Sequence, residues 1–327
     1  MSLTIKGYSG KGNWYKGNLH CHTTDSDGRL TPQEVVDLYR SAGYDFLAIS
    51  DHNIFSDYRE KFDSENFIIL PAMEASAALF ADESKKNLIK LHHIHGILGT
   101  ENMQRKAPKG VFTHSQKYPE WEYFGKWDGA TVAQKLQDDL QAHGCLTIYN
   151  HPVWSRVSEE EFINTKGLTA LEIYNYGTVN ESATGYDSLR WDVMLRNGNR
   201  IFATASDDNH NREVPDSLGG YIMVKAEELS QEAIVEAILG GNYYSSSGPE
   251  IYDWGIRNGV AYVQCSPVSR VNFMAGNAVN AGASVLSKTE QDDMTYAEFT
   301  LCGKETYLRV ECVDRHGKIA WSNPIFL

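Results

Sequence analysis

The chain has 327 residues, 42% of them hydrophobic, which is enough to bury an enzyme-sized core in one large domain plus a smaller one. This composition excludes a disordered or fibrous protein. The formal net charge of -13, from 43 acidic and 30 basic side chains, argues against a surface for long nucleic acids, whereas a small anionic substrate or a short oligonucleotide held by metal ions is compatible with it.

The sequence shows neither a secretion signal nor a membrane-spanning segment. The first residues lack the charged and apolar segments of a secretion signal, and no apolar run approaches the roughly 18 residues that span a bilayer. The five cysteines show no Cys-x-x-Cys spacing, as expected of reduced thiols. We therefore expect a cytoplasmic protein without a membrane partner, and the patterns point to no particular oligomeric state.

The first chemical motif follows a short apolar run near residues 19–21. In an extended strand alternate side chains share a face, so His20 and His22 can bind one cation while Cys21 points away. Asp27 returns from the turn that follows. The segment therefore predicts the beginning of a metal site.

Apolar strand-like runs then alternate with helical patterns as far as about residue 225. The sequence Thr31-Pro-Gln-Glu34 predicts a capping box that opens an amphipathic helix over residues 32–42. Further helices are predicted over residues 131–142, 186–197 and 231–239, and strands near residues 46–50, 67–72, 89–94, 145–150, 169–174, 201–205 and 220–224. This alternation favours an α/β domain with largely parallel strands, and seven or eight strands with helices between them predict a barrel.

Polar side chains of similar type recur where the later apolar runs end. They are His52, Glu74, His92, His93, His95, His151, Asp207, Asp208 and His210. Because the carboxyl ends of the strands carry the chemistry in barrel enzymes, we expect these residues to gather with the first motif around one centre. Strand alternation puts His93 and His95 on one face and His92 on the other.

Two segments depart from the alternation. Residues 99–128, rich in Lys, Pro, Gly and aromatic side chains, predict either a lid or a surface excursion with its own aromatic cluster. After Pro249 the pattern changes to short alternating stretches with Gly and Asn turns, which is typical of antiparallel strands. We therefore expect a metal-binding barrel in residues 1–248 and a small β-sandwich-like domain in residues 249–327.

These residues resemble the motifs of the PHP family, named for polymerase and histidinol phosphatase, over roughly residues 18–225. The similar motifs are His20-x-His22 with Ser26-Asp27-Gly28, Ser50-Asp51-His52, Met73-Glu74, Asn150-His151-Pro152 and Asp208-x-His210. The closing Trp321-Ser-Asn-Pro324 resembles the β tail of two-domain members. The resemblance implies a metal-dependent phosphoesterase on a distorted TIM-like (β/α)7 barrel.

The resemblance also ranks the candidate ligands. The family has one histidine followed by an apolar pair and glycine, which favours His93 over His95 by its spacing to Gly96. Asp208 gives the Asp-x-His spacing, so it ranks before Asp207. The predicted metal ligands are His20, His22, Asp27, His52, Glu74, His93, His151, Asp208 and His210, with His95 and Asp207 in reserve.

Imidazole and carboxylate ligands together suit Mn²⁺, Fe²⁺ or Zn²⁺. Nine ligands are too many for one ion, so we expect two or three divalent metal ions, with the Glu74 carboxylate as the hypothesised bridge. Asp51, beside His52, is interpreted as a partner that orients an imidazole. Arg156 and Arg212 are candidates for orienting a phosphate.

The leading functional interpretation is hydrolysis of a small phosphorylated metabolite or nucleotide by metal-hydroxide attack on phosphorus. One alternative is hydrolysis of a carboxylic ester or carbamate, since hydroxide also attacks carbonyl carbon. Another is a non-catalytic barrel stabilised by its metals, which binds partners. Glu172 could support the ligands, and Trp154, Tyr174 and Tyr176 could stack on a base or sugar, although such aromatic residues as often serve packing.

Overall fold

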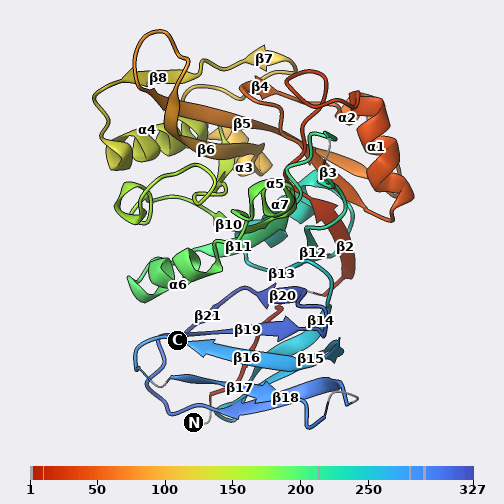
Figure 1. Cartoon of the computed structure of the whole chain (residues 1–327). Helices are drawn as coiled ribbons and strands as arrows, with labels where there is room; N and C mark the ends of the chain where they lie inside the picture. Colours follow the sequence, from red (N-terminus) through yellow and green to blue (C-terminus); the bar gives the residue numbers. More distant parts are fainter. Residues whose placement is uncertain (1–2, 10, 213, 280, 290–291) are drawn as a thin grey trace.

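The computed structural model describes all residues except 1–2, 10, 213, 280 and 290–291, and it has a mixed α/β fold. In Figure 1 a part with helices and strands lies above a part made of strands, and both termini lie in the lower part. In the described residues, no helix has the length and apolar character needed to cross a membrane.

The longer helices lie where the sequence patterns predict them, and shorter ones lie between. The helices are α1 (Pro32–Ser41), α2 (Arg59–Phe62), α3 (Glu101–Arg105), α4 (Gly129–Ala142), α5 (Tyr176–Ser182), α6 (Ser188–Arg196) and α7 (Gln231–Leu239), with a 3-10 turn η1 (Glu159–Glu161). The capping box of α1 is confirmed, because the Thr31 hydroxyl accepts the Glu34 N–H and the Glu34 carboxylate accepts the Thr31 N–H.

One large sheet positions the predicted site. Its strands follow in the order β11 (Phe202–Ser206), β10 (Ala170–Asn175), β9 (Cys145–Tyr149), β6 (Leu88–Leu98), β5 (Ile68–Phe80), β3 (Phe46–Ile49), β2 (Asn13–Asn18), β12 (Tyr221–Ala226) and β13 (Tyr243–Ser246). Strands β2, β3 and β5 are parallel, and so are β9, β10 and β11. Strand β6 runs antiparallel to both of its neighbours.

The prediction of largely parallel strands therefore holds only in part. Residues 81–87 join β5 directly to β6, and so short a connection closes a hairpin, whereas a parallel pair needs a longer crossover. As a result, His93 and His95 lie within β6 and not at its carboxyl end.

The predicted closed barrel is not shown, because the order of paired strands is open with β11 at one edge. Residues 19–22, here called the extension of β2, nevertheless contact the loop after β11. The His22 N–H donates to the Asn209 carbonyl at 3.1 Å, and the Asp208 N–H donates to the His20 carbonyl at 3.0 Å. This contact brings the first and last predicted motifs together.

Residues 99–128 are tied to the sheet by strand pairing. Strand β7 (Gln116–Lys117) pairs with β4 (Ile54–Phe55), and β8 (Trp121–Phe124) pairs in parallel with β5. The Tyr123 and Trp127 rings pack edge to face, with their centroids 5.3 Å apart. The segment thus matches the interpretation as a surface excursion with its own aromatic cluster better than the interpretation as a lid.

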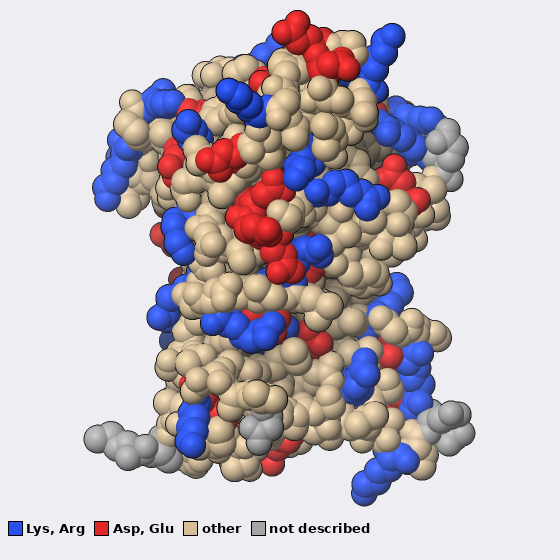
Figure 2. Space-filling model, turned by 60° about the vertical axis from the view of Figure 1, so that its left-hand side comes forward, with Lys and Arg blue, Asp and Glu red and all other residues tan. Residues whose placement is uncertain are grey.

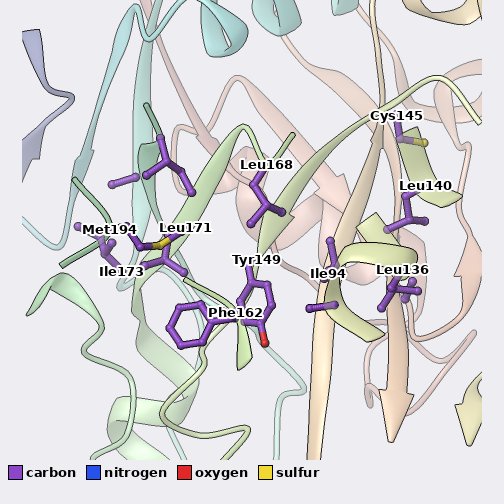
Figure 3. Close-up of a cluster of buried hydrophobic side chains, with 14 of the residues drawn as sticks. Ile94, Leu136, Leu140, Cys145, Tyr149, Phe162, Leu168, Leu171, Ile173 and Met194 are labelled. Atoms are coloured by element: carbon purple, nitrogen blue, oxygen red, sulfur yellow. The ribbon is translucent and has the colours of Figure 1, made fainter. Parts of the chain in front are cut away.

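A buried apolar cluster fixes the orientation of β6. Figure 3 shows Ile94 of β6 beside Leu136 and Leu140 of α4, and all three are fully buried. Burying a side chain of this size contributes about 1.5–3 kcal/mol. Because side chains alternate along a strand, a core-facing Ile94 sends His93 and His95 to the opposite face.

The C-terminal segment is antiparallel β structure, as predicted. Its strands are β14 (Ile251–Arg257), β15 (Val260–Val268), β16 (Arg270–Ala275), β17 (Gly282–Leu286), β18 (Met294–Thr300), β19 (Tyr307–Val313), β20 (Ile319–Ser322) and β21 (Ile325–Phe326). Strands β14, β15 and β18 form a second sheet with β1 (Ile5–Lys6), and the others continue the large sheet because β20 pairs with β13. Asn323, from the closing motif, accepts the Ala203 N–H of β11 at 3.0 Å.

Candidate metal centre

Two imidazoles from the extension of β2 meet a carboxylate from the loop after β11. His20 and His22 are fully buried, and the Nε2 atom of each lies 3.0 Å from Oδ1 of Asp208. Cys21, between them, belongs to a separate apolar cluster. The extended backbone therefore separates the two histidines from the intervening thiol, as expected from strand alternation.

The buried carboxylate of Glu74 on β5 lies at the middle of the cluster. Its Oε1 atom lies 3.2 Å from Nε2 of both His20 and His151. Its Oε2 atom lies 3.0 Å from Nδ1 of His52 and 3.1 Å from Nδ1 of His93. Each oxygen thus lies beside two imidazoles, so Glu74 would be able to share its oxygens between neighbouring cations if they bind there.

A third set of side chains lies nearer to solvent. Oδ1 of Asp27 lies 3.2 Å from Nε2 of His210 and 3.6 Å from Nε2 of His52. Oδ2 of the same carboxylate pairs with Nη2 of Arg212 at 2.6 Å. Because the Asp27 side chain is 43% exposed, this end of the cluster is open to a ligand from solution.

All nine predicted ligands belong to four overlapping groups in which the donor atoms lie within 4.8 Å of one another. The groups are His22 with Asp27, His52 and His210; His20 with His22 and Asp208; His20 with Glu74 and His151; and His52 with Glu74 and His93. Residues from distant parts of the chain therefore form one continuous cluster.

The three neighbouring histidines of β6 have different surroundings. His93 joins Glu74, whereas His95 packs edge-on to the His20 ring with the centroids 4.2 Å apart. His92 points to the other face, where its ring stacks on Trp127. The geometry favours His93 as a ligand and leaves His95 as a neighbour of the cluster.

The adjacent aspartates are separated in the same way. The Asp207 carboxylate accepts the N–H groups of residues 218–220 and the Tyr39 hydroxyl, so its oxygens already have protein donors. Burial raises the pKa of Asp207 to about 6. Asp208 points to the histidines instead, which favours it as the ligand.

The three residues predicted to act beside the metals are placed differently from one another. Arg212 lines the pocket. Arg156 is exposed and is not among the pocket-lining residues of the described chain. Asp51 was predicted to orient an imidazole. Its carboxylate instead accepts the Thr23 N–H at 2.8 Å and the Ser26 hydroxyl at 2.6 Å, so it anchors the loop before Asp27.

Glu172 on β10 has the role that was predicted for Asp51. Its Oε1 atom lies 2.9 Å from Nδ1 of His20 and accepts the Ser206 hydroxyl at 2.6 Å. Its Oε2 atom accepts the His151 N–H at 3.2 Å and an Asn175 amide hydrogen at 2.9 Å. A carboxylate at Nδ1 fixes the ring orientation and leaves Nε2 free to bind a metal.

Replacing Glu172 with glutamine is expected to weaken metal binding, since the His20 ring loses its charged partner. Changes at such positions typically reduce metal affinity or activity by about 10–100-fold. Calorimetric titration with Mn²⁺ measures the effect, with Glu159→Gln on exposed η1 as the matched control. A lower thermal stability with unchanged Mn²⁺ affinity would show that Glu172 serves only the fold.

The backbone is strained at the two ligands that follow β9 and β11. His151 has φ +25° and Asp208 has φ +56°, values that residues with a side chain rarely adopt. Gly28 fills another tight position, because a Cβ atom there would lie 2.7 Å from the His22 carbonyl carbon. The backbone N–H of His151 donates to Glu172 and that of Asp208 donates to the His20 carbonyl, and these hydrogen bonds hold both residues in place.

Buried donor atoms without protein partners test whether the cluster suits metal ions. The Nδ1 atom of His22 is buried without a hydrogen-bond partner in the described structure. The Nδ1 atom of His93, Oε2 of Glu74 and Oδ1 of Asp208 are buried at ion-pair distance from polar atoms of the cluster, but they form no hydrogen bond there. Such groups are costly unless something compensates them. Divalent cations bound by nitrogen and oxygen would do so, and we conclude that the residues fit metal ions.

The pKa shifts indicate ionised carboxylates among two kinds of imidazole. Burial lowers the pKa of His22 and His93, whereas neighbouring carboxylates raise the pKa of His20, His151 and His210. Burial by itself raises the pKa of Glu74, but the histidines around it, His93 foremost, hold that pKa well below its usual range. Burial lowers the pKa of His93 to about 4. Burial by itself would also lower the pKa of His210, but Asp27 and Asp208 outweigh this effect and raise that pKa to about 9.

A cavity of about 250 Å³ opens onto the cluster. Besides predicted ligands and Arg212, its lining includes Trp154, Gly177, Thr178, Glu181, Val214 and Asp216. Of these residues only Trp154 was predicted from the sequence. Asn150 was noted only as part of the Asn150-His151-Pro152 motif, without a role of its own, and its amide donates to Glu74 Oε1 at 2.6 Å. An amide next to a ligand at a strand end was the available signal for that role.

No protein-family model matches the chain, and no curated protein matches its sequence. Among solved structures, a two-domain protein from Bacteroides vulgatus ATCC 8482 containing a predicted PHP-like metal-dependent phosphoesterase is similar at 11% identity and a TM-score of 0.45, covering 99% of this chain and 98% of its own. A candidate metal-dependent phosphoesterase from Bifidobacterium adolescentis ATCC 15703 is similar at 15% identity and a TM-score of 0.42, and the match covers 71% of this chain and 97% of the other.

An amidohydrolase from Chromobacterium violaceum, with bound sulfate and no metal, is similar at 14% identity and a TM-score of 0.39, covering 59% of this chain and 87% of its own. The first of these similar structures carries the name of the PHP family, which is also the family that the sequence motifs resemble.

Proposed function

We propose that the chain is a metal-dependent hydrolase that cleaves the phosphoester bond of a small phosphorylated metabolite or nucleotide. The observation that carries this proposal is the convergence of nine imidazole and carboxylate side chains in one pocket, with Arg212 at its rim. Such a donor set can hold cations, and the guanidinium can hold an anion beside them.

Two or three divalent ions would be held by the four overlapping ligand groups, with Glu74 shared between neighbouring positions. Bound there, the ions lower the pKa of water to near neutrality and neutralise charge on phosphoryl oxygens. Glu172 and Asn150 keep His20 and Glu74 in place through their hydrogen bonds. The chain itself thus supplies rigid positioning, which phosphoester hydrolysis depends on.

Arg212 is the residue best placed to orient the phosphate. Its Nη2 atom pairs with the Asp27 carboxylate at 2.6 Å, and its side chain is 45% exposed, so further N–H donors can reach a phosphoryl oxygen. A guanidinium offers five donors, and one carboxylate does not use them all. Arg212 can therefore bind the ligand loop and the substrate at the same time.

The size of the cavity and the surface charge favour a small substrate. A volume of about 250 Å³ is small for a ligand pocket and therefore favours a small phosphorylated molecule. Figure 2 shows one face on which Lys and Arg are interspersed with Asp and Glu, and a larger acidic group lies near its middle. On that face no continuous basic track is available to a long polyanion.

The proposal is tested with Mn²⁺-loaded protein and a panel of phosphomonoesters, nucleotides, short oligonucleotides and p-nitrophenyl acetate. We expect phosphate release that requires metal and is lost in His22→Ala. His316→Ala, which changes an exposed histidine far from the cluster in sequence, is the matched control and should keep full activity. Turnover of the acetate ester alone would replace phosphoester hydrolysis with carbonyl hydrolysis, and silence across the panel with metal bound would reject both.

A further inference from the structure

The part of the pocket wall that carries no predicted metal ligand combines an aromatic ring with a carboxylate. Trp154 and Glu181 both line the cavity, and neither belongs to the metal-ligand groups. They come from separate segments, the loop after β9 and helix α5, and the indole Nε1–H donates to Oε2 of Glu181 at 3.1 Å. This hydrogen bond makes the pair one surface beside the cluster.

Trp154 lies directly beside two predicted ligands. Its ring centroid lies 5.1 Å from that of His151, at an interplanar angle of 83°, and 6.0 Å from that of His93. The side chain is half-buried and packs against a small apolar cluster around Leu91. These contacts hold the ring at a fixed position in the cavity wall beside the cluster.

Glu181 adds a negative charge to the same wall. The side chain is exposed, and within the described chain its second oxygen, Oε1, receives no donor. A carboxylate at this place accepts hydrogen bonds from hydroxyl groups and repels another anion. Arg212, the pocket's arginine, pairs with Asp27 and so marks the end of the pocket suited to the phosphate.

We propose that Trp154 and Glu181 select the leaving group, favouring the ring of a sugar monophosphate and rejecting a leaving group that carries a second negative charge. This inference rests on the proposed phosphoesterase function. The C–H face of a sugar ring is apolar and can lie on an indole, while its hydroxyls donate to a carboxylate. A second phosphate on the sugar would face Glu181 at close range.

A nucleobase shares part of this chemistry, because it also stacks and its amino groups donate hydrogen bonds. The pocket favours the sugar for reasons of size and charge. The cavity of about 250 Å³ must hold the phosphate as well as the leaving group, which leaves little room for a ribose and a base together. Ring hydroxyls also give the carboxylate more donors than one exocyclic amino group does.

The experiment compares kcat/KM of the metal-loaded full chain for glucose 6-phosphate, glucose 1,6-bisphosphate, AMP and ethyl phosphate. Ethyl phosphate has neither a ring nor a hydroxyl and serves as the reference. Glu181→Gln should lower the preference for glucose 6-phosphate over ethyl phosphate by about tenfold, because a neutral amide oxygen replaces a charged acceptor. It should also raise the relative rate of the bisphosphate by roughly tenfold.

Trp154→Leu should lower the preference for the sugar, and Trp154→Phe, which keeps an aromatic ring, should restore much of it. Glu160→Gln, on exposed η1, is the matched control and should change neither ratio. Unchanged ratios in Glu181→Gln with intact turnover of ethyl phosphate would overturn the inference and leave the proposed function standing. If the Trp154 and Glu181 variants lose turnover of AMP but keep that of glucose 6-phosphate, the assignment to a sugar is overturned.

If no phosphoester is turned over, calorimetry with glucose 6-phosphate and inorganic phosphate decides the inference separately. A roughly tenfold weaker affinity of Glu181→Gln for glucose 6-phosphate, with unchanged affinity for inorganic phosphate, would support a sugar-binding wall without catalysis. Equal affinities of both proteins for glucose 6-phosphate would overturn it.

Discussion

Replacing Glu74 with glutamine is expected to abolish activity and to reduce the number of bound metal ions by at least one. Each carboxylate oxygen lies within 3.2 Å of two imidazole nitrogens, so the change removes a charge at the centre of the cluster. An amide has one oxygen to share and places N–H hydrogens where a cation should lie. Since losing a mere supporting partner costs 10–100-fold, kcat should fall by more than about 100-fold.

Metal content, measured by inductively coupled plasma mass spectrometry after gel filtration, and the rate of phosphate release provide the two readouts. Glu65→Gln, at an exposed position outside the predicted site, is the control for a lost carboxylate. Folding is checked by circular dichroism, because Glu74 is fully buried. A folded Glu74→Gln protein with the wild-type metal content would contradict its role as a bridging ligand.

Local signals predicted those elements that short stretches of chain determine. The Thr31 capping box begins α1, and the helical patterns place α4, α6 and α7 within about two residues of their bounds. Strand alternation separates His92 from His93 and His95, since β6 is a regular strand packed against α4 on one face. Each of these features depends on neighbours within a few residues.

Features that depend on distant contacts were missed. The direction of β6 depends on how its connection to β5 closes, and the open sheet depends on which strand edges meet. Arg156 was proposed from its spacing to His151, yet it is exposed, with φ +61° at a turn that spacing alone does not reveal. Glu181 lies 27 residues from its partner Trp154, and no local pattern relates the two.

The predicted ligands show why the site could be predicted better than the barrel. Seven of the nine predicted ligands lie in the segments that follow strands, whereas Glu74 and His93 lie within β5 and β6. An apolar run next to a polar side chain is a local signal in both cases, and it does not depend on which strands are neighbours. The network behind them was harder to predict, because Asp51 and Glu172 are both buried acids near ligands in sequence or in space. Only the fold shows that Glu172 reaches His20 whereas Asp51 reaches Thr23 and Ser26.

Removing the metals with a chelator is expected to abolish activity and to lower the free energy of unfolding. A ligand that binds only the folded chain stabilises it by about 2.7 kcal/mol at a concentration 100 times its dissociation constant. The ligands come from β2 to the loop after β11, so the unfolded chain cannot reproduce the site. Denaturant titration of chelated and Mn²⁺-loaded protein, with apo protein reloaded with Mn²⁺ as the control, measures the difference.

The stability lost on chelation should depend on pH in a defined direction. In the metal-free chain the pKa of His210 is raised to about 9 by Asp27 and Asp208, so this imidazole carries a proton at pH 7 that a bound metal would displace. The proton stabilises the metal-free fold fully below about pH 6.5, the usual pKa of histidine, and this contribution is lost as pH rises through 9. The gap in stability between loaded and chelated protein should therefore widen from pH 6.5 to 9, and His210→Gln, but not His316→Gln, should flatten that dependence. A gap that narrows over this range would contradict the assignment of His210 to the metal cluster.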